Sequence, residues 1–174
     1  DELRPFYFYN KEKIKIYTNK ETSYFLLERF NYLFNKSSSS QSYFKPPLEM
    51  HIIDYFEELI INNVSINTIK QNHGVIDTLG FIFNNQLAYC TDVVDFPKKS
   101  FDKLNNLKVL IITGLRETPH MAHAHFDLSF KWISNLKPEI AYLTHLSPES
   151  DHDAVTNLCP PGVLPAYDGL VINI

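Results

Sequence analysis

The apolar residues in the first half of the chain recur with two different spacings. Alternation of apolar and polar residues predicts strands at residues 13–18, 48–53, 58–62 and 64–70. Residues 20–34 instead place their apolar side chains along one broad side of a helix, and Asn19 is suited to cap its start. This half is therefore expected to consist of short strands and one long helix.

Two segments of the first half are interpreted as loops. Residues 1–6 begin with polar side chains and meet Pro5 at once, which predicts a loop. Residues 37–42 are rich in serine and precede Pro46 and Pro47, a composition typical of a flexible surface loop.

Strands and helices alternate in the second half. Residues 78–84 and 87–91 flank a polar Asn-Asn-Gln turn and predict a hairpin. The later elements are expected as a helix at 98–104, a strand at 108–113, a helix at 126–135, a strand at 141–147, a helix at 151–158 and a strand at 170–174. The strand at 108–113 is almost entirely apolar, which favours a sheet covered on both faces and an α/β fold.

Three of the predicted strands end in side chains that bind metals. His73 follows the strand that runs through residue 70, Asp92 follows the second arm of the hairpin, and His145 follows the apolar run at 141–144. Imidazole and carboxylate ligands suit Zn²⁺, Mn²⁺ or Fe²⁺. Taken singly, each is more simply an ordinary polar residue, but three such residues at three strand ends favour a metal site.

A second group of histidines lies in the loop before residue 126. His120, His123 and His125 fall within six residues, at a point where a helix is expected to begin. Histidines there can pair with a phosphate oxygen or donate a proton. The spacing alone is equally compatible with a separate metal site or with solvated polar residues.

Length and composition restrict the remaining choices. A chain of 174 residues with 44% hydrophobic content fits a single domain. The net charge of −4 provides no general basic surface for nucleic acid. Cys90 and Cys159 are too few for a disulfide framework, and no apolar run is long enough for a membrane span, so a cytoplasmic location is expected.

Five short motifs, taken in order, resemble the metallo-β-lactamase superfamily. They are His73-Gly74, the Tyr-Cys-Thr-Asp of residues 89–92, Leu115-Arg116 with the Pro-His-Met-Ala-His of residues 119–123, the Leu-Thr-His-Leu-Ser of residues 143–147, and residues 161–170. The resemblance is greatest to the phosphodiesterase branch that includes the phosphoribosyl cyclic-phosphate phosphodiesterase. It implies an αββα sandwich with two divalent metal ions, Zn²⁺ or Mn²⁺, at one edge.

The resemblance also implies a role for individual residues. His73 corresponds to a ligand of one metal, Asp92 to the bridging carboxylate and His145 to a ligand of the second metal. His123 resembles the family's active-site histidine that is not a ligand and acts as a general acid or phosphate contact. His120 and His125 flank it as candidate substrate contacts, and the role of Asp168, which matches a later motif, stays open.

One diagnostic family motif is missing from the chain. His-x-His-x-Asp-His supplies four of the seven metal ligands in the family, and it does not occur in this sequence, which begins at Asp1 without a methionine. We therefore expect an N-terminally truncated sandwich that exposes one edge or face of its sheet, binds metal weakly and hydrolyses little alone. The missing upstream segment, or a homodimer mate, is the expected partner, and a small phosphodiester is the expected substrate.

Two other functions remain open from the sequence. A nuclease of the same superfamily that processes the 3′ end of transfer RNA is one, although the negative charge provides no surface for RNA. A non-catalytic remnant, or one half of a split gene that acts only with its partner, is the other.

Overall fold

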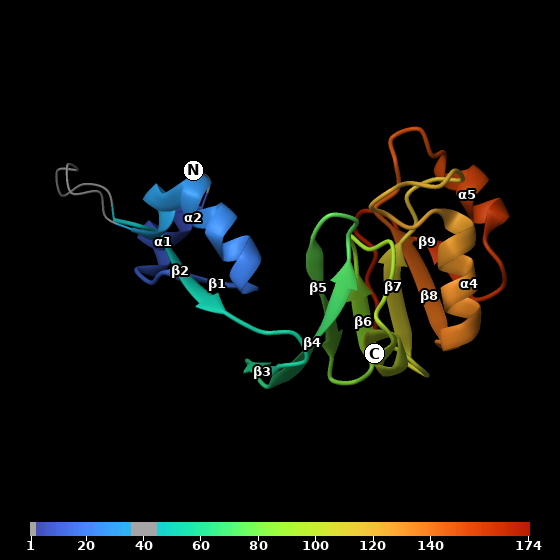
Figure 1. Ribbon diagram of the computed structural model, residues 1–174, viewed down its shortest axis with the longest axis horizontal. Coiled ribbons are helices and arrows are strands. Elements are labelled where there is room, and N and C mark those ends of the chain that lie inside the picture. The colour runs from blue at the N-terminus through green and yellow to red at the C-terminus, as the bar shows by residue number, and fades with distance from the viewer. Residues whose placement is uncertain (1–2, 36–44) are drawn as a thin grey trace. The chain divides into compact units, whose positions relative to one another are not determined.

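The computed structural model describes residues 3–35 and 45–174. They fall into two compact units, Asp1–Asp54 and Tyr55–Ile174, which we treat separately (Figure 1). The single domain expected from chain length stays a prediction, and the serine-rich loop expected at residues 37–42 lies outside the described residues.

The first unit pairs two strands with two helices. Its elements are α1 (Arg4–Asn10), β1 (Ile14–Thr18), α2 (Lys20–Phe34) and β2 (Leu48–Ile52), and the two strands pair in parallel. Asn19 caps α2 as expected, its side chain accepting a hydrogen bond from the Thr22 N–H at 2.8 Å. The loop expected at residues 1–6 is wrong for residues 4–6, because α1 begins at Arg4 and Pro5 occupies its first turn. A proline there costs no helical hydrogen bond, since the N–H groups of the first turn have no partner within the helix.

The second unit is built on one seven-stranded sheet. Its strands are β3 (Glu58–Ile61), β4 (Val64–Asn72), β5 (Asp77–Phe83), β6 (Leu87–Cys90), β7 (Val109–Thr113), β8 (Ile140–Thr144) and β9 (Val163–Pro165), and they neighbour one another in chain order. The strands from β3 to β6 pair antiparallel, which confirms the hairpin of β5 and β6. Those from β6 to β9 pair in parallel, so β6, β7 and β8 have their carboxyl ends at one edge of the sheet.

One face of this sheet forms the core of the second unit with α3 (Lys98–Lys103), α4 (Phe126–Leu136) and α5 (His152–Leu158). Ile69, Leu110, Ile112 and Leu143 are fully buried there with Leu136 of α4. Each such side chain contributes roughly 1.5–3 kcal/mol by leaving water. This core holds the strand ends rigidly in place.

The opposite face carries an apolar row in strict register. Phe81 pairs with Tyr89, Tyr89 with Ile111, Ile111 with Tyr142, and Tyr142 with Leu164, across five neighbouring strands. Because side chains alternate between faces along a strand, this open-face row lies opposite the core. Tyr89 is 41% exposed and Leu164 is 44% exposed.

The strand expected at residues 170–174 is wrong. The last strand is β9, which pairs with β8, and the following segment makes no ladder with any described strand. Gly169 turns the chain with φ +90°, and beyond it Val171 is 79% exposed. An alternating apolar sequence becomes a strand only where a neighbouring backbone can pair with it, and the described residues provide none here.

In residues 3–35 and 45–174, no helix combines the length and the apolar content that a membrane crossing requires.

Candidate metal centre

His73 is oriented by the histidine loop. It follows β4, and its Nδ1 lies 2.8 Å from the carbonyl oxygen of Ala122. Because a carbonyl oxygen only accepts, Nδ1 carries the proton and the Nε2 lone pair is available to a cation. The loop can approach this closely because residue 74 is glycine: its φ is +80°, and an added Cβ would lie 3.0 Å from the Met121 carbonyl oxygen.

Asp92 and His145 both end strands in a left-handed backbone conformation. Asp92 follows β6 with φ 55°, and His145 follows β8 with φ 62°. This conformation is uncommon for residues other than glycine and is found at functional sites more often than elsewhere. The Asp92 Oδ1 atom lies 3.9 Å from Nε2 of His145, so the two turns direct their side chains to a common point.

His123 joins the same point from the loop after β7. Its Nδ1 is 3.9 Å from the Asp92 Oδ1, and its ring centroid is 4.5 Å from that of His73 and 4.7 Å from that of His145. Candidate ligand atoms of His73, Asp92 and His123 lie within 4.8 Å of one another. The three strand-end residues expected from the sequence therefore converge, with His123 among them.

The surroundings keep His123 neutral. Burial lowers its pKa below the ordinary histidine value, the neighbouring His73 and His145 lower it further, and the Asp92 carboxylate opposes them. Its Nδ1 is buried and has no hydrogen-bond partner among the described residues. A neutral imidazole with an unpaired nitrogen beside a carboxylate is a donor set that fits a divalent cation such as Zn²⁺ or Mn²⁺.

His120, His125, Asp168 and Cys90 lie farther from the Asp92 carboxylate or take no part in the cluster around it. The His120 ring is 5.1 Å from that of His123, and its Nδ1 accepts a hydrogen bond from the Ala122 N–H at 3.2 Å. His125 sits at the amino end of α4 without a side-chain capping bond, and Asp168 is exposed in the carboxyl-terminal segment. Cys90 is fully buried, and burial raises the pKa of its thiol, so it does not resemble a thiolate ligand.

Sequence reasoning placed His123 in the active site but outside the ligand set. The structure groups it as closely with Asp92 as His145 is, so its position permits either role. The signal that pointed to it was the density of histidines in one loop. The Ala122 carbonyl that orients His73 has no signal in the sequence, because it arises only when the loop folds against β4.

Comparison with known proteins identifies the family. The beta-lactamase superfamily domain matches residues 1–146, most of the chain. The chain belongs to this superfamily. The mixed α/β fold described above is the fold of this superfamily. No curated protein sequence matches the chain.

Solved structures of the superfamily share this fold. A diphosphatase of the PhnP family is 28% identical with a TM-score of 0.79, over 91% of this chain and 57% of its own. The metallo-beta-lactamase fold protein YhfI from Bacillus subtilis is 15% identical with a TM-score of 0.73, over 99% of this chain and 72% of its own. The short form of human tRNase Z is 12% identical with a TM-score of 0.64, over 94% of this chain and 68% of its own. This chain therefore spans little more than half the length of the diphosphatase.

Proposed function

We propose that the chain contributes part of the metal centre of a two-metal phosphodiesterase that acts on small or cyclic phosphodiesters. The observation that carries the proposal is the convergence of two imidazoles, from His123 and His145, on one oxygen of Asp92, with His73 alongside. The resemblance of the motifs to the phosphodiesterase branch of the superfamily supports the substrate class.

Each residue has a distinct role in this proposal. His73 would hold one cation through Nε2 and His145 would hold the second, and Asp92 could serve both because a carboxylate offers two hard oxygens. When bound, the two ions supply Lewis acidity to the phosphoryl group and make water a better nucleophile. In this proposal His73, Asp92 and His145 set where the attacking water and the phosphoryl oxygens lie.

We assign to His123 the transfer of a proton to the leaving group. Attack of water on phosphorus breaks the bond to the alcohol oxygen. The neutral imidazole takes the proton that the water gives up, and the resulting imidazolium passes it to the departing alkoxide. Burial and neighbouring imidazoles lower the pKa of His123, so a proton held there is given up readily. The position of His123 beside Asp92 also suits a metal ligand. The metal content of a His123 variant distinguishes the ligand role from the role in proton transfer.

The described residues bring fewer candidate ligands together than two metal ions need. Catalytic zinc sites ordinarily use about three protein ligands for each ion. We therefore infer that the chain alone binds metal weakly and turns over little, and that an upstream segment or a second chain completes the site. A cytoplasmic location is part of the same proposal.

The test compares the chain alone with a joined protein, in which the His-x-His-x-Asp-His segment of a superfamily member is placed before this chain. Mn²⁺ and Zn²⁺ are titrated calorimetrically, and hydrolysis of bis(p-nitrophenyl) phosphate, a cyclic ribose phosphate and a precursor transfer RNA is measured. We expect tight metal binding and hydrolysis of the small diesters only in the joined protein. Robust turnover by the chain alone would overturn the partial-site proposal, and preference for transfer RNA would replace the substrate class.

A further inference from the structure

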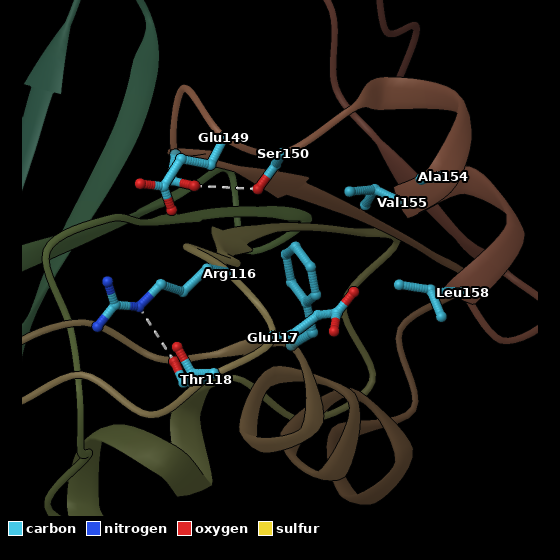
Figure 2. Close-up of a pocket in the computed structure, with 10 residues that line it drawn as sticks. Arg116, Glu117, Thr118, Glu149, Ser150, Ala154, Val155 and Leu158 are labelled. Atoms are coloured by element: carbon cyan, nitrogen blue, oxygen red, sulfur yellow. Dashed lines mark hydrogen bonds between the residues drawn. The ribbon is translucent and has the colours of Figure 1, made fainter.

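A pocket of about 210 Å³ lies between the β7–α4 loop and the segment after β8 (Figure 2). Arg116 and Glu117 line it from the first loop, and Ser147 and Glu149 line it from the second segment. Neither the strand-end pattern nor the family motifs assigns this pocket a ligand.

The two segments that form the pocket also carry the histidines of the metal centre. Arg116 donates from Nη2 to the Pro119 carbonyl oxygen at 3.3 Å, immediately before His120, and the Ser147 N–H donates to the Leu115 carbonyl oxygen at 2.8 Å. Ser147 itself lies two residues after His145. The pocket therefore shares its two wall-forming segments with the histidines of the metal centre.

The walls of the pocket differ in chemistry. In Figure 2, Arg116 and Glu149 lie on one side, and Val155 and Leu158 lie on the other. Phe126, which is only 4% exposed, adds an aromatic surface. An adjoining cavity of about 440 Å³ shares Phe126 and Leu158, so the apolar side continues along α4. Such a lining suits an organic group with both carbon surface and hydroxyls.

The charge of the lining selects against anions. Glu117 and Glu149 bring two carboxylates, and Arg116 is the single cation among the lining residues. Two of its N–H groups are already engaged, Nε with the Thr118 carbonyl oxygen and Nη2 with that of Pro119, both at 3.3 Å. A second phosphate or a carboxylate placed here would meet like charge.

We propose that this pocket binds the organic alcohol portion of the phosphodiester, a small group with apolar carbon and no further negative charge. The inference rests on the proposed function for the identity of the substrate, but not for the existence of the binding site. It makes Glu117 and Glu149 specificity determinants and Leu158 a contact for the alcohol's carbon atoms.

Binding is tested without metal and without turnover. Two probes are titrated into the ¹⁵N-labelled chain: the methyl phosphodiester of 3,3-dimethylbutanol, which ends in an uncharged apolar group, and that of 3-hydroxypropanoate, which ends in a carboxylate. Amide shifts are followed at Glu117, Ser150, Ala154 and Leu158. We expect the uncharged probe to shift these amides and to bind about fivefold more tightly than the anionic probe.

Variants of exposed residues keep the fold intact while testing the contacts. Glu117→Gln combined with Glu149→Gln should reduce the preference for the uncharged probe to about twofold or less, and Leu158→Ala should weaken that probe about threefold. Glu139→Gln is the matched control, because Glu139 precedes β8 at the opposite end of that strand. It should leave both affinities unchanged.

The outcomes separate this inference from the proposed function. Equal binding of the two probes, unchanged preference in the double variant, or no shift at these amides overturns the pocket assignment whatever the enzyme hydrolyses. Selective binding of the uncharged probe, together with no hydrolysis of any phosphodiester by the joined protein, contradicts the proposed function and leaves the binding site supported.

Discussion

Gln71 of β4 donates a hydrogen bond from Nε2 to the carbonyl oxygen of Thr91 at 2.7 Å, across 20 residues of sequence. The same amide lies 3.2 Å from Thr78 Oγ1, which in turn donates to the carbonyl oxygen of Asp92 at 2.8 Å. Two side chains from β4 and β5 thus fix the backbone on which the Asp92 carboxylate is mounted. The left-handed turn at Asp92 is held by these bonds.

Replacing Gln71 with leucine should disturb that turn. Gln71 is fully buried, so its loss leaves the Thr91 carbonyl unpaired and costs about 1–3 kcal/mol of unfolding free energy. Movement of Asp92 should also weaken Mn²⁺ binding by about tenfold. Urea denaturation and metal titration measure the two effects. Gln86→Leu, in the turn between β5 and β6, is the control, and an equal loss of metal affinity there would show that the effect is not local.

Asp92 and His123 should differ in what their removal abolishes. Asp92→Ala removes the carboxylate to which both imidazoles point, so metal content and turnover of the joined protein should fall together. His123→Ala should lose turnover and retain metal if His123 delivers a proton. Metal analysis by mass spectrometry beside a phosphodiesterase assay decides this. Equal metal loss in both variants would assign His123 to the ligands instead.

Gly74→Ala should destabilise the protein more than Gly162→Ala. Both glycines have φ near +80°, so both substitutions strain the backbone by about 1 kcal/mol or more. Only at Gly74 does the added Cβ meet a neighbour, the Met121 carbonyl oxygen at 3.0 Å. We expect an additional loss of about 1 kcal/mol in urea denaturation and a displaced histidine loop. Similar losses of unfolding free energy at both positions would show that the histidine loop moves away from the added methyl group at little cost.

The two cysteines should react with thiol reagents at very different rates. Cys90 is fully buried and Cys159 is half-buried, and burial raises the pKa of both thiols. In the folded chain at pH 8, dithionitrobenzoate should therefore modify Cys159 first and Cys90 only after unfolding. Two equally fast reactions would contradict the buried position of Cys90.

The raised pKa of Cys90 also predicts a pH dependence of stability. Its folded pKa lies above the value near 9 of an exposed thiol, so the unfolded chain loses the proton first as pH rises. Stability from this group is complete below pH 8 and declines above pH 9, by up to about 1.4 kcal/mol per pH unit. Denaturation of wild type and Cys90→Ala across this range isolates the contribution, because the variant should lack that slope.

The open-face row should make the isolated chain bind hydrophobic dyes. Tyr89 and Leu164 expose apolar surface on a face that carries three further apolar residues in register. Tyr89→Ser with Leu164→Ser should lower dye fluorescence and concentration-dependent association measured by light scattering. Val75→Ser is the control, because Val75 is 90% exposed outside this row. Equal effects of the control would assign dye binding elsewhere.

The sequence predicted most strands because their apolar residues alternate, and it predicted the meeting of His73, Asp92 and His145 because strand ends share an edge. It missed α1 because Pro5 was weighed as a breaker rather than as a first-turn residue. It also placed a strand at residues 170–174, where pairing depends on a neighbour that a local pattern does not reveal.

Other features of the site depend on tertiary contacts alone. The carbonyl of Ala122 at His73, the left-handed turn at His145 and the pocket beside Arg116 each arise from segments distant in sequence. Secondary-structure propensity depends on a residue and its neighbours in sequence, so it does not predict contacts between distant segments.

The strand order has a consequence for synthesis on the ribosome. His73 and Asp92 follow β4 and β6, whereas His145 follows β8, which can pair only after β7 and the α4 crossover have been translated. A nascent chain that stalls before β8 carries His73, Asp92 and His123 and lacks only His145 of the four converging side chains. His145 is therefore the last of the four to arrive, after most of the described strands have left the exit tunnel.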